Sequence, residues 1–232
     1  MATGAVTGLA SEASIARRLG LMAAVGAGTQ QGTETAIAAL IAAGAPGLVS
    51  FGIAGGLSPT LAPGALLLPP AVRSIAGEGH FVDVDWHARL IGAAREAALP
   101  VIAIGGILGA DRIAATAEAK ARLHAETNAI AIDLESHLVA AAARRARLPF
   151  VILRAIADPA NRNLPEAALI PLAASGEPNL LRVVASLLRA PSQLPDLLQL
   201  RRDARTAVAA LEQGARALGL SLTRLEPGGA TA

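Results

Sequence analysis

The chain has 232 residues and a formal net charge of +2, and 53% of its residues are hydrophobic while only 2% are aromatic. This length and apolar content suffice for one compact domain with a core of Ala, Leu, Ile and Val. The shortage of aromatic rings and the small net charge argue against a nucleic-acid surface, so no nucleic-acid partner is expected. The absence of cysteine excludes disulfides, thiolate nucleophiles and cysteine metal ligands.

Short apolar runs bounded by glycine alternate with alanine-rich stretches, which is typical of an α/β fold with a mostly parallel sheet covered by helices. Strands are expected at Ala5–Thr7, Leu21–Val25, Leu48–Ile53, Ala65–Val72, Val101–Ile107, Ala129–Ile132 and Phe150–Ala157. Helices are expected at Ser11–Leu19, Thr33–Ala43, Asp85–Ala98, Ala117–His124, Leu134–Arg147 and Glu166–Ala174. We therefore expect a single α/β domain.

The texture of the sequence changes beyond Gly176. Helices are expected at Leu180–Leu188 and Leu194–Leu218, separated by Ala190-Pro191-Ser192, with arginines among apolar residues. We expect a main domain over residues 1–178 and a C-terminal helical extension over residues 179–232, packed on that domain or on a partner subunit. Leucines at helical spacing beside arginines also suit a weak contact with anionic lipid, so packing on protein and peripheral membrane contact both stay open.

The start of the chain bears on its location. Residues Met1–Ala10 lack the basic and apolar regions of a signal peptide. Together with the absence of cysteine, this favours a cytoplasmic protein. Peripheral contact with the inner membrane through the C-terminal helices stays open.

The first glycine-rich turn, Gly26-Ala27-Gly28, follows an expected strand and precedes an expected helix, as a dinucleotide-binding fingerprint does. However, Gln31 replaces the third glycine of that fingerprint, and no acid lies near residue 46, where the ribose-binding acid is required. We therefore expect a tight strand-to-helix turn rather than an NAD site.

A second glycine cluster, Gly52, Gly55 and Gly56, lies at the carboxyl end of an expected strand. Glycines at such a place allow the chain to leave the strand sharply, or allow backbone to come close to a ligand. Composition alone does not separate these two interpretations.

Two acids follow buried strands. Glu135 lies at the start of an expected helix, where it could accept the hydroxyls of a ligand or only be stabilised by the helix dipole. Asp158 lies at the tip of an apolar strand before Pro159, where it could meet a ligand or only cap the following turn.

Other site types lack their sequence signatures. The four histidines, His80, His87, His124 and His137, do not have the spacing of metal ligands, so no metal is expected. There is neither a Gly-x-Ser-x-Gly nucleophile elbow nor a phosphate-binding Walker A sequence.

Four segments in this order resemble the nucleoside phosphorylase-I superfamily: Thr7–Glu12, Ser50–Leu57, Ile132–Ser136 and Leu153–Pro159. The most similar branch is that of the methylthioadenosine/S-adenosylhomocysteine nucleosidases, and the likeness runs from about Ala5 to about Ala174. It implies a nucleoside phosphorylase-like domain with a central mixed, mostly parallel twisted sheet flanked by helices. Within the superfamily the arginine-rich stretch Arg189–Pro195 is similar to the hopanoid-associated phosphorylases.

The resemblance implies a purine nucleoside phosphorylase or nucleosidase that cleaves an N-glycosidic bond. The expected substrate is adenosylhopane, cleaved to adenine and a ribosyl or phosphoribosyl hopane during hopanoid biosynthesis. A methylthioadenosine/S-adenosylhomocysteine-type nucleosidase is the first alternative, and a non-catalytic purine-nucleoside binding protein is the second. The resemblance also implies a homodimer without a cofactor, with phosphate as an optional co-substrate.

Matched motif by motif, the resemblance implies roles for individual acids. Glu12 corresponds to the acid that activates water, at a position where phosphorylases commonly have a phosphate-holding arginine. Asp158 corresponds to the acid that protonates the purine. Glu135 corresponds to the acid that grips the ribose hydroxyls, and Leu134 takes the place of a methionine that usually packs under the sugar.

The resemblance also implies apolar and backbone contacts with the substrate. These are expected from Ile53, Ala54 and Gly55 in the second glycine cluster and from Ile113, with Ala114, in the purine pocket. Relatives often place serine or threonine where Ile53 lies, and its absence weakens the case for phosphate. If phosphate is used, Arg73 or Arg112 could supply the charge.

Overall fold

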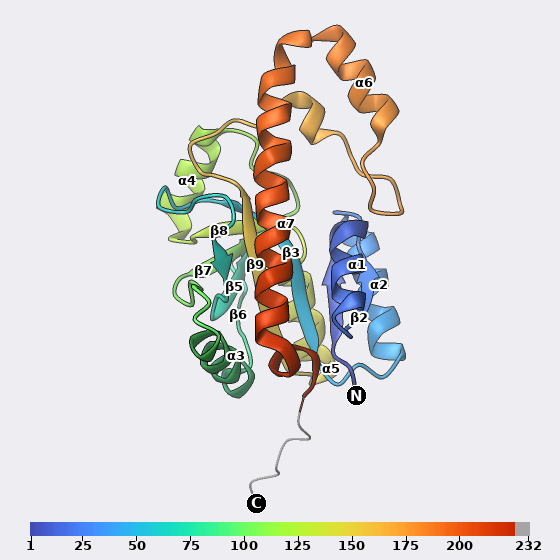
Figure 1. Ribbon diagram of the computed structural model, residues 1–232, viewed down its shortest axis with the longest axis vertical. Helices are drawn as coiled ribbons and strands as arrows, with labels where there is room; N and C mark the ends of the chain where they lie inside the picture. The colour runs from blue at the N-terminus through green and yellow to red at the C-terminus, as the bar shows by residue number, and fades with distance from the viewer. Residues whose placement is uncertain (226–232) are drawn as a thin grey trace, which may run out of the picture.

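The computed structural model describes residues 1–225. Its strands are β1 (Gly4–Thr7), β2 (Met22–Val25), β3 (Leu48–Gly56), β4 (Leu66–Leu67), β5 (Ala71–Ser74), β6 (Gly79–Phe81), β7 (Gly106–Gly109), β8 (Ala131–Asp133) and β9 (Phe150–Asp158). Its α-helices are α1 (Ala10–Arg18), α2 (Gln30–Ala42), α3 (Val84–Glu96), α4 (Ala117–Thr127), α5 (Ser136–Ala146), α6 (Leu180–Arg189) and α7 (Leu194–Thr223). Figure 1 shows this arrangement.

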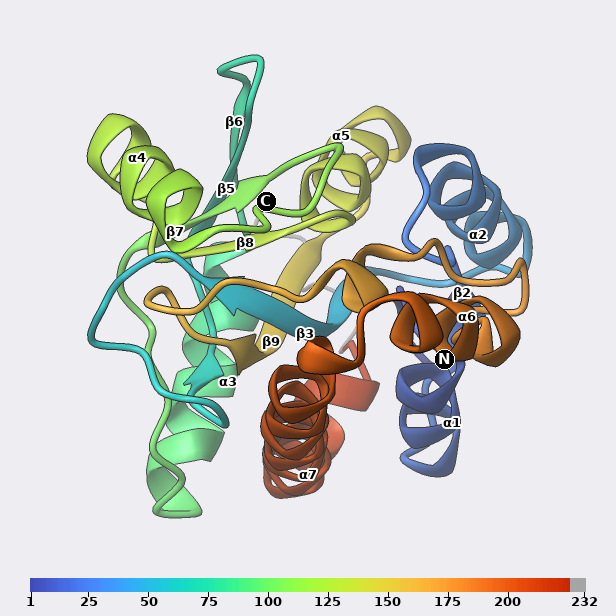
Figure 2. The ribbon, with the colours of Figure 1, turned by 90° about the horizontal axis from the view of Figure 1, so that it is seen from above.

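The strands form one sheet in the order β2-β1-β3-β8-β7-β5-β6, and β9 pairs with β3 and β4. Five pairings are parallel (β1 with β2 and with β3, β3 with β9, β5 with β7, β7 with β8), and three are antiparallel. In Figure 2, α2 and α5 lie on one face of the sheet, and α1, α3 and α7 lie on the other. The expected α/β domain with a mixed, mostly parallel sheet is confirmed.

The longest strands, β3 and β9, run side by side through the core. Every residue of β9 is buried, as expected for an apolar strand covered on both faces. An irregularity between Ala54 and Gly55 shifts the register, so that Gly55 pairs with Asp158. The parallel pairing therefore brings the second glycine cluster beside the expected acid at the end of β9.

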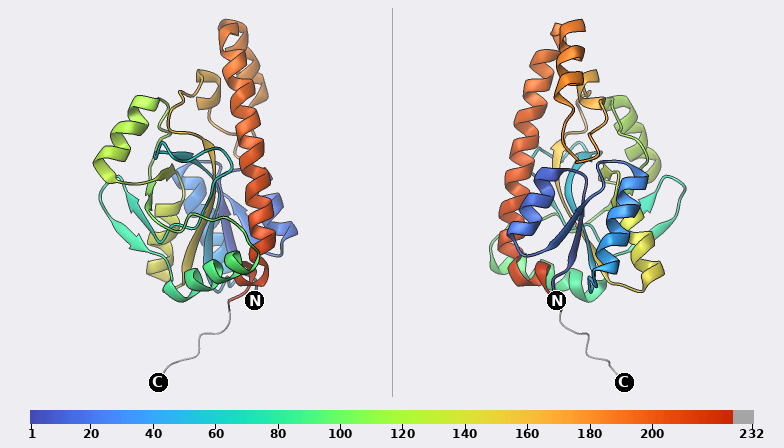
Figure 3. Two further views of the ribbon diagram at one scale, coloured as in Figure 1. Left: turned by 60° about the vertical axis from the view of Figure 1, so that its left-hand side comes forward. Right: turned by 90° about the vertical axis from the view of Figure 1, so that its right-hand side faces the viewer.

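The long helix α7 packs against β9 and α3 along its C-terminal part. Its side chains Ala207, Leu211, Ala215 and Leu218 belong to the main core. Its first turns, residues 194–202, bury no side chain and rise above the sheet beside α6, as Figure 3 shows. The last seven residues of the expected extension, 226–232, lie outside the described residues.

Two expected strands differ from the structure. Ala65–Val72 is not continuous, because Pro69 and Pro70 separate β4 from β5. Most of Val101–Ile107 is irregular, and β7 begins only after Gly105, whose φ of +78° turns the chain. The short strand β6, which pairs with β5 in an antiparallel hairpin, was not expected.

The expected helix Glu166–Ala174 is wrong beyond its first turn. Only a 3-10 turn over Glu166–Leu169 forms, and Ile170 is extended with a ψ of 125°. Pro171 explains this difference, since a proline disfavours helical backbone at the residue before it. At the other end of the chain, α7 continues past Leu218 to Thr223 with a kink at Gly219.

Candidate active site

Glu12 lies in the first turn of α1, just beyond the end of β1, and is only 1% exposed. Its Oε2 atom accepts hydrogen bonds from the N–H groups of Gly8 (3.0 Å) and Leu9 (2.9 Å), and Oε1 accepts one from Ile53 (2.9 Å). Burial raises the pKa of Glu12, against the lowering effect of Arg154. The hydrogen bond from Ile53 holds Oε1 in place. Because each carboxylate oxygen has two lone pairs, Oε1 can still accept one more hydrogen bond.

Arg154 lies within β9 and joins the acids of the site. Its Nη2 atom lies 2.7 Å from an oxygen of Asp133, 3.0 Å from Oε2 of Glu135 and 2.7 Å from the hydroxyl of Ser50. All four side chains are buried. Because an unpaired charge in the interior costs several kcal/mol, the arginine and its acids stabilise each other's charged forms. Asp133 and Glu135 contact Arg154, and Glu12 lies near enough for its charge to act on it. We call Glu12, Asp133, Glu135 and Arg154 the carboxylate cluster.

Glu135 precedes α5, but its carboxylate does not cap the helix. Asp133 supplies the acceptor at the helix start instead: its Oδ1 accepts from the N–H of Ser136 at 3.1 Å, and its Oδ2 contacts the Ser136 hydroxyl. Burial raises the pKa of Glu135 to about 7, although Arg154 lowers it. The Glu135 carboxylate is therefore not engaged in holding the helix terminus.

Two glycines pack so closely against the carboxylate cluster that neither position has room for a side chain. A Cβ atom on Gly52 would lie 2.7 Å from Oε1 of Glu12 and 2.6 Å from the guanidinium of Arg154. A Cβ atom on Gly8 would lie 2.7 Å from Oε1 of Glu135 and 3.8 Å from Oε2 of Glu12. Backbone therefore comes close to the side chains of the cluster at both positions, which accounts for Gly52 in the second glycine cluster.

Asp158 ends β9, and its carboxylate does not cap the following turn. Its Oδ2 atom lies 2.5 Å from the Nζ atom of Lys120, which comes from α4. Its Oδ1 atom is buried and has no hydrogen-bond partner among the described residues. Burial raises the pKa of Asp158, whereas Lys120 and then Arg162 lower it.

The end of β3 contributes backbone to the site. Ile53 donates its N–H to Glu12 and accepts a hydrogen bond from Arg154 at its carbonyl (3.3 Å). Gly55 lies opposite Asp158 across the strand pair. The methyl group of Ala54 belongs to the main core, so this residue can meet a substrate only through its backbone.

The apolar residues expected around the substrate are less closely grouped. Leu134 and Ala114 pack in the same small apolar cluster. Leu134 also lies near the first glycine-rich turn, because a Cβ atom on Gly28 would be 3.8 Å from it. Ile113 is 48% exposed, and no described contact joins it to the acids.

Residues 159–179, which we call the covering segment, cross over the sheet near β3 (Figure 2). Leu164 donates its N–H to the carbonyl of Ala115 at 2.7 Å, and Gly176 accepts from the N–H of Ala10 at 3.2 Å. The segment thereby reaches from the loop before α4 to the start of α1. It leads directly into α6.

A family model described as the phosphorylase superfamily matches residues 21–189, which is 169 of the 232 residues. The chain belongs to the phosphorylase superfamily. Membership identifies it as an enzyme that cleaves N-glycosidic bonds, as expected from the four motifs. A comparison with curated proteins finds no match.

Solved structures share the fold of this superfamily member at low identity. The 5′-methylthioadenosine/S-adenosylhomocysteine nucleosidase of Colwellia psychrerythraea 34H, in complex with adenine, has a TM-score of 0.71 and 16% identity, with 95% of each chain covered. The corresponding enzyme of Neisseria meningitidis has a TM-score of 0.70 and 15% identity, covering 94% of this chain and 98% of that one. Futalosine hydrolase of Helicobacter pylori strain 26695 has a TM-score of 0.66 and 15% identity, covering 92% and 97%. These likenesses establish the fold.

Three residues of this phosphorylase superfamily site, Asp133, Arg154 and Lys120, had no role predicted from the sequence. The signal for Arg154 was an arginine within an otherwise apolar strand, and the signal for Lys120 was its being the only lysine of the chain. Arg73 and Arg112, considered for phosphate, are both exposed, and neither belongs to the carboxylate cluster.

Proposed function

We propose that this enzyme removes adenine from an adenosyl compound, with adenosylhopane as the substrate in hopanoid biosynthesis. The observation that carries the proposal is the placement of the acids. Arg154 pairs with Glu135, and its charge lowers the pKa of the nearby Glu12, while Asp158 ends the strand that holds Arg154. Glu12 and Glu135 can therefore act at the sugar while Asp158, a separate acid, acts at the purine.

Breaking an N-glycosidic bond leaves positive charge on the ribose and negative charge on the purine. Glu135, once ionised, accepts hydrogen bonds from the ribose hydroxyls and stabilises the positive charge. Burial raises the pKa of Asp158 and so favours its protonated form, which gives its proton to N7 of the purine. Glu12 accepts the proton of an attacking water through the remaining site on Oε1.

Water is the attacking group that we propose. Arg154 is already engaged by Asp133 and Glu135, and a phosphate dianion beside the carboxylate cluster would be repelled. The test is to compare initial rates with and without phosphate and to identify the sugar product. Equal rates and a free ribosyl product support water as the attacking group. Phosphate-dependent turnover to a sugar phosphate would show that phosphate attacks instead.

The substrate is tested by incubating the purified protein with adenosylhopane, 5′-methylthioadenosine and adenosine and following adenine release. We expect the highest kcat/KM for adenosylhopane. A clear preference for 5′-methylthioadenosine would instead favour the nucleosidase alternative. Binding of all three compounds without adenine release would contradict the proposed reaction.

The exposed apolar face of helix α6 favours the proposal that the substrate is apolar and resides in a membrane. Its residues Leu180, Leu181, Val184 and Leu188 are 70%, 85%, 54% and 78% exposed, and they form one stripe of the helix beside Arg182 and Arg189. None of the helices within residues 1–225 combines the length and apolarity needed to cross a bilayer. We propose that α6 contacts the surface of an anionic bilayer, since apolar burial and arginine attraction act together there.

Leu181→Gln/Leu188→Gln tests the lipid contact, with Leu220→Gln, at an exposed leucine of α7, as the control. We expect the unmodified protein and the control to sediment weakly with phosphatidylglycerol vesicles at low salt, and the double variant to lose this binding. Cleavage of adenosylhopane in vesicles should fall more than cleavage of adenosine. Failure of the unmodified protein to bind these vesicles would contradict the lipid contact.

A further inference from the structure

Lys120 is the only lysine in the chain, and its side chain is fully buried. An ammonium group has three N–H donors and loses several kcal/mol of hydration in the interior unless acceptors replace the water. Three acceptors, one for each N–H, are present around Lys120. The Nζ atom lies 2.5 Å from Oδ2 of Asp158, 3.1 Å from the carbonyl of Pro159 and 2.8 Å from the carbonyl of Arg162. Lys120 thus fixes the end of β9 and the start of the covering segment.

The same contacts distinguish the two oxygens of Asp158. Lys120 holds Oδ2, whereas Oδ1 is buried and has no partner among the described residues. A buried oxygen without a partner is rare in folded proteins and calls for an explanation. A purine that brings a nitrogen to Oδ1 would supply the missing hydrogen bond.

Building on the proposed function, we propose that Lys120 is a positioning residue that prepares Asp158 to transfer its proton to the purine. Because Nζ holds Oδ2, the carboxylic acid presents Oδ1 to N7. As the C1′–N9 bond breaks, its electron pair goes to the purine, the Oδ1 proton moves to N7, and the O–H electron pair stays on Asp158. The new carboxylate charge is neutralised by the ammonium group, which keeps its own protons.

Two cations act on Asp158, Lys120 from α4 and Arg162 from the covering segment. Arg162 is itself paired with Asp203 of α7, whereas Asp158 is the only acid that Lys120 contacts within residues 1–225. Burial raises the pKa of Asp158 and Lys120 lowers it, so removal of Lys120 raises it further. An acid that must be protonated stays active up to its pKa, and therefore the alkaline limb of the rate profile should then move to higher pH.

The variant Lys120→Met removes the charge and keeps the length of the side chain, and Arg122→Met makes the same change at an exposed position of α4. Adenine release from 5′-methylthioadenosine and adenosine is measured over a wide pH range. Lys120→Met should lower kcat by at least about tenfold and move the alkaline limb upward by about one to three pH units. Arg122→Met should change neither, and Lys120→Arg should restore the position of the limb. An unmoved limb in Lys120→Met would overturn the proposal.

A second measurement does not depend on turnover or on the stability of that variant. Labelling the only lysine with ¹⁵N gives a single side-chain NMR signal. We expect adenine and the variant Asp158→Asn each to shift this signal. A signal that ignores Asp158→Asn would overturn the pairing even in an active enzyme. Shifts without any adenine release would instead overturn the proposed function and leave the pairing intact.

Discussion

The protonation state of Glu135 is open to a direct test by pH. Burial raises its pKa from the ordinary value of 4.5 to about 7, and burial also raises the pKa of Glu12. The proposed mechanism needs both carboxylates ionised. A raised pKa means that the charge is lost as the pH falls through the higher value, so kcat/KM for adenine release should decline below about pH 7. A profile that stays flat down to pH 4.5 would contradict this role.

Single residues of the site differ in how far the sequence could predict them. Asp158 ends β9, Glu135 follows the end of β8, and Glu12 lies in the helix after β1, so a motif that locates the strand end also locates the acid. The contact between Lys120 and Asp158 joins α4 to β9, and no local pattern encodes it. Its prediction would have required the packing of that helix on that strand.

At the scale of elements, the close contacts of Gly52 in β3 predict a loss of activity on substitution. A Cβ atom on Gly52 meets Glu12 and Arg154 below 2.8 Å, while one on Gly92 of α3 meets nothing within 4 Å. Gly52→Ala should therefore displace the cluster and lower kcat/KM by about a hundredfold. Gly92→Ala, measured in parallel by urea unfolding, should raise the free energy of unfolding by about 0.5–1 kcal/mol. Similar activity in the two variants would mean that the cluster tolerates the displacement.

The elements that the sequence predicted well are those that are buried along most or all of their length. The starts of β3 and β9 were predicted at Leu48 and Phe150, because both strands are apolar runs buried on both faces. The stretch after Val101 is equally apolar, yet most of it is irregular. Apolar composition alone did not distinguish a buried strand from a buried connection there.

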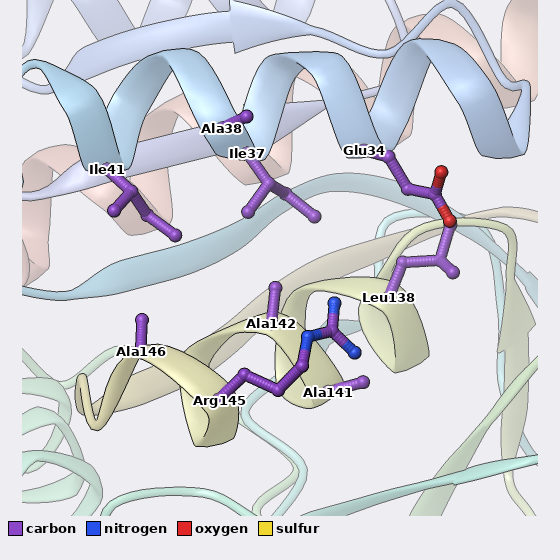
Figure 4. Close-up of a pocket in the computed structure, with 9 residues that line it drawn as sticks. All are labelled: Glu34, Ile37, Ala38, Ile41, Leu138, Ala141, Ala142, Arg145 and Ala146. Carbon is purple, nitrogen blue, oxygen red and sulfur yellow. The ribbon is translucent and has the colours of Figure 1, made fainter.

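At the scale of the whole molecule, we propose that the chain forms a homodimer. A groove of about 400 Å³ between α2 and α5 is lined mainly by isoleucine and alanine side chains (Figure 4). Glu34 lies on α2 and Arg145 on α5, so a second copy related by a two-fold axis could pair these opposite charges. Its lining residues include none of the carboxylate cluster, which separates this surface from the site.

The dimer is tested by the mass of the protein in solution. Ala38→Glu places a charge in the groove, and Ala39→Glu places the same charge on an exposed neighbour outside it. We expect sedimentation to give a dimer for the unmodified protein and for Ala39→Glu, and a monomer for Ala38→Glu. A monomeric mass for the unmodified protein contradicts the homodimer, and a dimeric Ala38→Glu would place the interface elsewhere.

The division of the molecule into a main domain over 1–178 and an extension over 179–232 remains a prediction, but the two helices beyond Gly176 behave differently. Helix α6 buries no side chain, whereas α7 places Ala207 and Leu211 in the main core. The sequence showed arginines and leucines in both helices. Only the packing of α7 against β9 separates the helix that completes the fold from the helix that leaves its leucines exposed.

The most direct test of the account is adenine release by the unmodified protein and by Glu135→Ala and Asp158→Ala, with circular dichroism to check the fold. We expect release from an adenosyl substrate by the unmodified protein and a loss of at least about a hundredfold in each variant. Near-normal turnover in either folded variant would contradict the role given to that acid, and no adenine release by the unmodified protein would contradict the proposed reaction itself.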